Sequence, residues 1–223
     1  MEAALGHVLP LALGIALSPL PIIAAILLLL APKARSASVG FLIGWIIGIL
    51  TAVIVFMIIA TVLPTPSVGG TRPVQAIIHL ALGALLVLLA VRQFRAHARA
   101  GGPPTLPTWM QALDRLGFWD ALGLGVLLAA VNPKNLILGA ESGIQFGLGS
   151  MSVAGGIWAI LLYTLVAAST ILVPVVAFLV AEKPLRHPLD ALRGWLEREN
   201  AVIMGVVLLV LGVVVIGKGI AAL

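Results

Sequence analysis

The sequence contains no cysteine, and this absence excludes several classes of function. Structural disulfides, thiolate metal sites and thiol–disulfide electron transfer through a membrane all require that residue. Charged residues are also scarce: they make up 9% of the 223 residues, whereas a soluble domain carries about 25%. Hydrophobic residues make up 61% of the chain. The sequence therefore predicts a polytopic membrane protein that folds as one helical bundle, without a separate soluble domain.

Signals for catalysis, metals and nucleic acid are missing as well. The four histidines lie far apart without helical pair spacing, so we expect no metal site and no cofactor. There is no nucleotide-binding glycine loop and no Ser-His-Asp set, so we expect neither an enzyme nor ATP-driven transport. The pI of about 10.5 comes from Lys and Arg residues scattered through loops. This scatter indicates a role in membrane topology and no binding of nucleic acid.

Six apolar stretches reach the roughly 20 residues that cross a bilayer. The N-terminus has no basic n-region, so the first stretch is predicted to be a span and not a cleaved signal peptide. The longest gap contains Gly101-Gly102-Pro103-Pro104, which predicts a flexible joint between two halves. We expect a first three-helix repeat at 1–95, a cytoplasmic linker with an amphipathic segment at 96–118, and a second three-helix repeat at 119–223. The predicted spans are Leu5–Ala31, Val39–Leu63, Val74–Arg92, Ala121–Phe146, Val153–Val180 and Ala201–Ile220.

Basic residues concentrate in alternate loops. The first, third and fifth loops together carry ten, whereas the opposite loops carry Arg72 and Lys218. The positive-inside rule places the ten in the cytoplasm, with both termini outside a plasma membrane. Leucine and tryptophan recur at helical spacing in Trp109–Leu116 and in Leu185–Leu196, which predicts two amphipathic helices on the inner leaflet. The ten are Lys33, Arg35, Arg92, Arg95, Arg99, Arg115, Lys183, Arg186, Arg193 and Arg198.

Two spans are interrupted near their middle by proline. Proline removes a backbone donor and frees the carbonyl four residues earlier, here on Ile15, Leu17 and Ala129. Inside a membrane such a break is tolerated only beside protein or a polar cavity. Lys134 stands next to the second break, although a lysine costs roughly 2.5–3.5 kcal/mol at a helix centre. We therefore predict a substrate-binding site formed by Ser18, Pro19, Pro21, Asn132, Pro133 and Lys134.

The two halves show a matching pattern. Gly40 and Trp45 follow Pro19 by 21 and 26 residues, and Gly155 and Trp158 follow Pro133 by 22 and 25 residues. Because each half has an odd number of spans, the second half would be inverted in the membrane. Inverted repeats with paired broken helices are typical of secondary transporters. The alternative is two ordinary proline kinks.

Three further features allow more than one interpretation. Lys134, together with the helix N-terminus beside it, could bind an anion, or its ammonium could satisfy the freed carbonyls. Glu141 is a candidate proton or cation carrier for coupling, or a charge near the outer surface, and His79 is expected to be a hydrogen-bonded packing residue. Glycines at four-residue spacing, 40–48 and 139–147, could pack within the fold or form a homodimer.

The segments Ser18–Ala25 and Asn132–Leu136 resemble the peptidoglycolipid-addressing (GAP) family of the lysine-exporter (LysE) superfamily, whose relatives include sulfolipid-addressing proteins of mycobacteria. Span number and spacing resemble that family over nearly the whole chain. The resemblance implies an actinobacterial inner-membrane protein concerned with moving cell-envelope lipids. Amino-acid exporters of the superfamily usually carry Pro-Gly-Pro at the first break, where this chain has Leu20 between its prolines.

Three functions remain open from the sequence. The first is secondary export of an anionic or polar-headed envelope (glyco)lipid, with the bilayer as its surroundings. The second is export of a small solute such as an amino acid or a cation, and the third is a non-transporting partner of an envelope-lipid export complex. A zwitterionic amino acid requires a fixed anion beside a fixed cation, and no carboxylate lies within one turn of Lys134. This favours the lipid.

Overall fold

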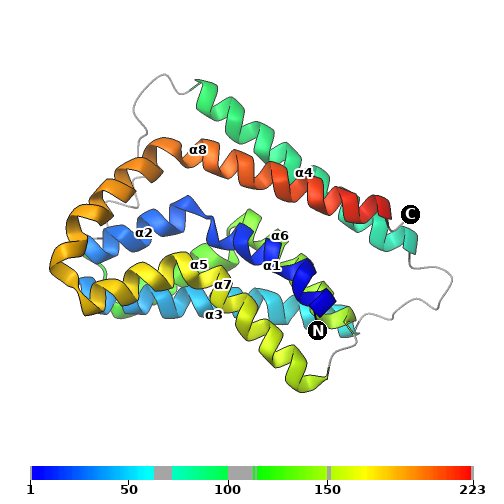
Figure 1. Ribbon diagram of the computed structural model, residues 1–223, viewed down its shortest axis with the longest axis horizontal. Helices are drawn as coiled ribbons and strands as arrows, with labels where there is room; N and C mark the ends of the chain where they lie inside the picture. The colour runs from blue at the N-terminus through cyan, green and yellow to red at the C-terminus, as the bar shows by residue number, and fades with distance from the viewer. Residues whose placement is uncertain (1, 63–71, 100–112, 114, 150–151, 222–223) are drawn as a thin grey trace.

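The computed structural model describes residues 2–62, 72–99, 113, 115–149 and 152–221, and within these ranges it contains helices and no strand (Figure 1). Four helices are long and apolar enough to cross a membrane, and two bent pairs bring the number of candidate spans to six. The predicted all-helical membrane protein is confirmed. The helices are α1 (Glu2–Ala16), α2 (Pro19–Leu30), α3 (Ala34–Val62), α4 (Arg72–Arg99), α5 (Phe118–Ala130), α6 (Pro133–Leu148), α7 (Val153–Val180) and α8 (Glu182–Ala221).

The two predicted breaks are present, and each ends one helix and begins another. The α1–α2 pair bends by 48° and the α5–α6 pair by 68°. Pro19 and Pro133 occupy the first position of α2 and α6, where the missing N–H costs no intrahelical hydrogen bond. The side-chain oxygen of Asn132 also accepts a hydrogen bond from the Lys134 backbone N–H at 3.1 Å. The proline therefore starts the second helix as well as stopping the first.

The helices form two groups. α4 packs along α8, and this helical pair lies as a separate layer over the other six helices in Figure 1. In the remaining group, which we call the body, α3 packs against α5 and α6, while α1 packs against α7. The pair meets the body mainly through α8, which contacts α2. An interface between the pair and the body therefore runs along the molecule.

Small residues allow the closest helix contacts. A Cβ atom added to Gly44 of α3 would collide with the carbonyl oxygen of Leu122 on α5, and one at Gly143 of α6 would collide with the carbonyl of Val53 on α3. The two glycine faces found in the sequence thus pack within the chain. A homodimer through the same faces would require these spans to separate.

Replacing Gly44 by alanine is expected to destabilise the bundle, because the new methyl group has no space against Leu122. Overpacking of this kind costs about 1–3 kcal/mol, and in a chain of this size it lowers the melting temperature by roughly 2–12 °C. Thermal unfolding of detergent-solubilised protein measures the effect. Gly123→Ala on α5 is the matched control, since no atom lies within 4 Å of its added Cβ. Equal melting temperatures for the two variants would contradict the close packing of α3 on α5.

Two elements extend beyond the predicted spans. α4 continues from Arg92 to Arg99, because no helix breaker occurs before Gly101. The predicted amphipathic segment Leu185–Leu196 is helical, as expected, but it is continuous with the last span and buries Leu189 and Leu196 against the core. Trp109 and most of the predicted linker lie outside the described residues.

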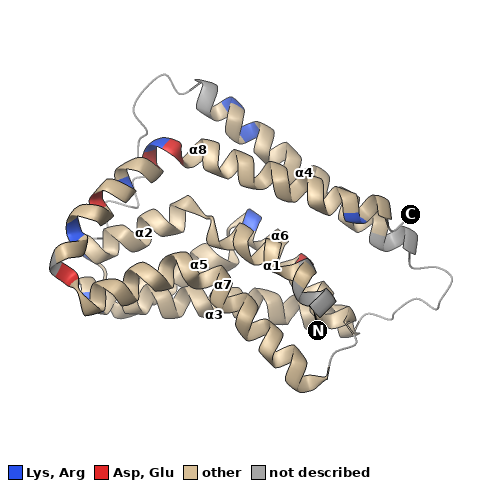
Figure 2. Cartoon of the chain, viewed as in Figure 1, with Lys and Arg blue, Asp and Glu red and all other residues tan. Residues whose placement is uncertain are grey.

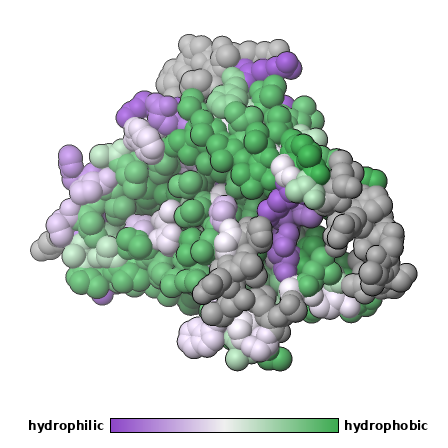
Figure 3. All heavy atoms as spheres, turned by 45° about the vertical axis from the view of Figure 1, so that its right-hand side comes forward, coloured by the Kyte–Doolittle hydropathy of each residue, from purple (hydrophilic) through white to green (hydrophobic). Residues whose placement is uncertain are grey.

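The charged residues are distributed unequally along the molecule. Most of those described gather at the end drawn on the left of Figure 2, which we call the basic end. The N-terminal part of α1 and the C-terminal part of α8 both lie at the opposite end (Figure 1). The flank shown in Figure 3 is mainly apolar, as expected for a surface in contact with lipid, with a narrow hydrophilic strip. The basic end is defined by Lys33, Arg35 and Arg186, which line one cavity there.

The tryptophans that suggested a repeat differ in environment. Trp45 on α3 is buried and stacks on Phe41 with ring centroids 6.4 Å apart. Trp158 on α7 is 69% exposed. The difference follows from the packing, because α3 is covered by both α5 and α6 along its length. The matching sequence spacing therefore does not extend to matching burial.

Candidate functional site

The two breaks meet inside the protein. The ammonium Nζ of Lys134 donates a hydrogen bond to the carbonyl oxygen of Gly14 at 2.5 Å, across 120 residues of sequence. The hydroxyl of Ser18 donates to Oδ1 of Asn135 at 3.2 Å, across 117 residues. All of these side chains are buried. The ends of α1 and α5 and the starts of α2 and α6 are therefore brought together at one crossing point.

Polar side chains satisfy the carbonyls that the breaks leave free. Besides Gly14, the carbonyl of Ala16 accepts from Thr170 Oγ1 at 2.7 Å, and that of Leu128 accepts from Asn135 Nδ2 at 3.4 Å. The sequence predicted that Lys134 could satisfy the carbonyl of Ile15, Leu17 or Ala129, and that prediction was wrong, because its ammonium bonds to Gly14. The last turns of α1 and α5 supply the free carbonyls, because their helical hydrogen bonds end at the break.

Lys134 has a structural role in this conformation. Its side chain is 2% exposed, and its ammonium lies at the C-terminal end of α1, where the helix dipole favours a cation. The sequence left two roles open for Lys134, binding an anion or satisfying a free backbone carbonyl, and the structure shows the second. An anion that reached this ammonium would have to displace the Gly14 carbonyl.

A groove lies beside the crossing point, between the helical pair and the body. It consists of two adjoining cavities of about 330 and 370 Å³, which share Gln93, Asn132, Pro133 and Met204. Three of the six predicted site residues, Asn132, Pro133 and Lys134, line it, whereas Ser18, Pro19 and Pro21 do not. None of the described lining residues is a carboxylate. The remaining lining residues are Leu20, Leu89, Arg92, Ala96, Leu127, Leu128, Val131, Asn200 and Leu208.

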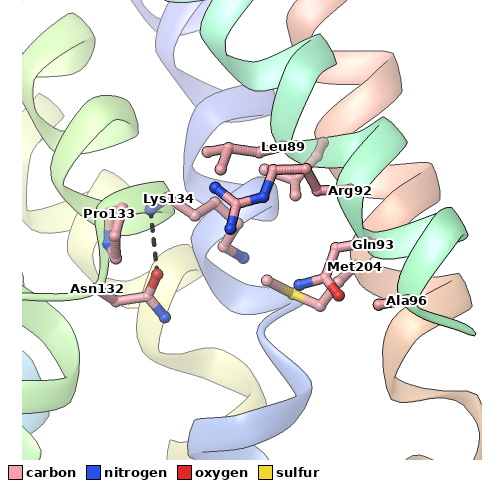
Figure 4. A pocket seen from close by; sticks show the side chains of 9 residues that line it. Leu89, Arg92, Gln93, Ala96, Asn132, Pro133, Lys134 and Met204 are labelled. Carbon is pink, nitrogen blue, oxygen red and sulfur yellow. Dashed lines mark hydrogen bonds between the residues drawn. The ribbon is translucent and has the colours of Figure 1, made fainter. Parts of the chain in front are cut away.

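Arg92 faces this groove from the wall opposite Lys134. It projects from α4 toward the start of α6, where Asn132, Pro133 and Lys134 form the opposite wall (Figure 4). Some arginines of the described chain are paired with acids: Arg193 lies 2.6 Å from Glu197, and Arg186 lies 3.0 Å from Glu182. Arg92 has no such acidic partner among the described residues. The groove therefore offers an unneutralised guanidinium next to a helix N-terminus, two features that favour anions.

Sequence reasoning missed three polar residues of the groove. Arg92 was assigned to a loop as a topology determinant, although the continuing helix places it two turns before the end of α4. Gln93 follows it into the groove. Asn200 also lines the groove, and its buried side-chain oxygen has no hydrogen-bond partner among the described residues. The sequence did contain a signal for two of them: Gln93 and Asn200 are amides that stand directly beside a predicted apolar span.

Glu141 lies in a different part of the same interface. Its side chain is 2% exposed and contacts His79 of α4 and Lys218 of α8. Glu141 is therefore a charge buried inside the protein, since α6 packs its polar face inward. His79 is hydrogen-bonded, as predicted, with its Nε2 3.0 Å from Oε1 of Glu141.

Another cavity lies at the basic end. It has about 530 Å³ and is lined by Lys33, Arg35, Glu182 and Arg186 among others. Its charged side chains are exposed, and Glu182 already neutralises two of them, Arg35 at 3.9 Å and Arg186 at 3.0 Å. It also contains neither helix break. The groove is therefore the stronger candidate for a binding site.

A comparison with known families gives a match over nearly the whole chain. A family model described as Sap, sulfolipid-1-addressing protein, matches residues 8–221. The chain belongs to the sulfolipid-1-addressing protein family. This match includes every groove residue and both breaks, and it confirms the resemblance to addressing proteins that the break motifs suggested. No curated protein and no solved structure matches the chain significantly.

Proposed function

We propose that this protein is a secondary transporter that exports an anionic or polar-headed envelope (glyco)lipid from the inner leaflet of the plasma membrane outward. The observation that carries the proposal is the groove, which presents Arg92 and the start of α6 and contains no carboxylate among its described lining residues. A sulfate, phosphate or carboxylate head would supply the missing negative charge. The name of the family points to a sulfolipid.

The walls of the groove also suit an acyl chain. Leu89, Met204 and Leu208 line the cavity beside Arg92. Arg92 and Ala96 are exposed, so the groove reaches the surface of the helical pair that would face lipid. A lipid could therefore place its head at the crossing point while its chains remain in the bilayer.

The alternatives are supported less well. A small amino acid would fit the volume, but its ammonium would find no carboxylate in the described lining. A non-transporting partner of an export complex would require no polar groove inside its own bundle. Placing polar groups inside a membrane protein costs free energy, and this cost favours a function for the polar groove.

The proposal includes an inverted repeat. Each unbroken middle span packs against the broken span of the other half, α3 on α5–α6 and α7 on α1–α2, while the third spans α4 and α8 pack on each other. Exchange of the two halves leaves this pattern unchanged, which supports the repeat.

We also propose that the basic end faces the cytoplasm. Cysteines introduced at Ser36 and Val153 should then react with impermeant reagents from inside and outside, respectively, and reaction of both from one side would contradict this topology.

Binding measurements on purified protein test the proposed substrate class. Isothermal titration should detect a short-chain sulfated or phosphorylated glycolipid at an affinity at least about tenfold above that of the matched neutral lipid, because a charge-assisted hydrogen bond contributes about 1.5–3 kcal/mol. Lysine and arginine should bind more weakly still. Preference for a free amino acid over both lipids would favour the small-solute exporter.

A further inference from the structure

A buried polar cluster joins three helices at the end of the molecule opposite the basic end. Oε1 of Glu141 on α6 lies 3.0 Å from Nε2 of His79 on α4 and 3.3 Å from Nζ of Lys218 on α8. The same oxygen accepts a hydrogen bond from Gln145 at 3.3 Å. One carboxylate oxygen thus connects the body to both helices of the helical pair.

The second oxygen of Glu141 is unoccupied by any described group. Oε2 is buried and has no hydrogen-bond partner among the described residues. A cavity of about 260 Å³ adjoins it, lined by His79, Glu141 and Gln145 together with three apolar residues. A buried carboxylate with one free oxygen beside a polar cavity is a site at which a proton can bind.

The position of the cluster relates it to the groove. Both lie in the interface between the helical pair and the body, because the groove is lined by Arg92 and Met204 of the pair and by Asn132 of the body. The cluster involves the first half of α4 and the end of α8, whereas the groove involves the second half of α4 and the middle of α8. The contacts of the Glu141 cluster would keep the interface closed at its own end, while the groove lies further along the same interface.

We infer that Glu141 is a proton-binding site, and that its ionised carboxylate holds the helical pair to the body through Lys218 and His79 as a latch. A proton on Glu141 cancels the charge that attracts both cations, so the latch releases and this end of the interface opens. The inference rests on the proposed function, since it assigns the coupling and the outer gate of that transporter. The proton would enter from the side on which the lipid leaves.

Other groups that face this region do not replace Glu141. From α7, the Tyr163 hydroxyl accepts a hydrogen bond from Ser142 at 3.0 Å and does not reach Glu141. α3 packs on this part of α6 with apolar residues such as Val53 and Met57. The described side chains of α1, Gly6 and Val8–Ala16, include no titratable group. The charged partners of Glu141 within the described chain are therefore His79 and Lys218.

Spin-label distances test the latch directly and without any lipid. Spin labels on cysteines introduced at Ile220 and Val153 report the distance between α8 and the body. A control pair at Val62 and Val153 reports a distance within the body, and all three positions are exposed. Acidification from about pH 7 to about pH 3, which covers the range in which glutamate side chains titrate, should lengthen the first distance by about 5 Å or more, the scale of a one-turn shift between packed helices. The control distance should not change.

Variants assign the response to Glu141. Glu141→Gln, which mimics the protonated side chain, should give the longer distance at every pH, whereas Glu141→Asp should keep the pH response. His79→Gln should also keep it. A pH-independent distance in the unsubstituted protein, a short distance in Glu141→Gln, or an equal change in the control pair would overturn the inference.

Should Glu141→Gln not fold, Lys218→Met must show the long distance at every pH instead, and a short distance in that variant would overturn the inference. Because these distances require no substrate, the latch and the proposed lipid can fail separately.

Discussion

Replacing Arg92 by glutamine is expected to lower the affinity for an anionic lipid by roughly 10- to 100-fold. The Lys134 ammonium is bonded to the Gly14 carbonyl, whereas the Arg92 guanidinium faces the groove without a described acid beside it. A hydrogen bond to a charged group contributes about 1.5–3 kcal/mol. Glutamine keeps much of the length and the polarity but removes the charge. Titration of the purified protein with the sulfated or phosphorylated glycolipid measures the loss.

Arg95 provides a matched control for that experiment. It lies three residues further along α4, is exposed, and lines neither cavity of the groove. Arg95→Gln removes the same charge from the same helix and should change the affinity less than about twofold, because a charge outside the groove makes no direct contact with the bound head and acts only through a field that salt screens. Equal losses in the two variants would show that surface potential, and not the groove, attracts the lipid.

Replacing Lys134 by methionine is expected to reduce lipid transport at least about tenfold while leaving the protein folded. Two opposing contributions to stability nearly cancel. The substitution removes a buried charge that costs roughly 2.5–3.5 kcal/mol in a span, but it leaves the Gly14 carbonyl without its donor, which costs about 1–3 kcal/mol. Transport suffers because the two broken spans lose the bond that joins them and the groove loses the cation next to it.

Thermal unfolding and transport must therefore be measured together for Lys134→Met. A stability within about 2 kcal/mol of the original, combined with lost transport, is the expected result. Full transport by this variant would show that Lys134 only fills a gap at the crossing point. Loss of folded protein would instead show that the Gly14 contact outweighs the cost of the buried charge.

The sequence predicted the helical class and both breaks because these depend on local properties. Apolar length marks a span, and proline placed at Pro19 and Pro133 fixes where a helix can begin. The carbonyl that accepts from Lys134 was not predicted correctly, because the rule for proline assumes an uninterrupted helix, whereas α1 and α5 end before the prolines. The start of the site could thus be located, but its hydrogen bonds could not.

The groove itself depends on contacts between distant segments. Nothing local in Arg92 distinguishes it from Arg95, and only the pairing of α4 with α8 turns it toward Asn132. The glycines Gly83, Gly205, Gly212 and Gly219, which allow that close pairing, were present in the sequence. The helices that these glycines contact could not be predicted, because a small residue indicates a close helix contact but does not indicate which helix makes it. The cluster of Glu141 with His79 and Lys218 was unpredictable for the same reason.

Lipid translocation by the reconstituted protein tests the central claim most directly. Proteoliposomes would carry an anionic glycolipid with a fluorescent chain, and an impermeant quencher would report its arrival in the leaflet that faces the end opposite the basic end. We expect the unsubstituted protein and Arg95→Gln to move this lipid, Arg92→Gln to move it at least about tenfold more slowly, and a neutral-headed analogue to move slowly with all three. Equal rates for the anionic and the neutral lipid, or an undiminished rate with Arg92→Gln, would contradict transport through the groove.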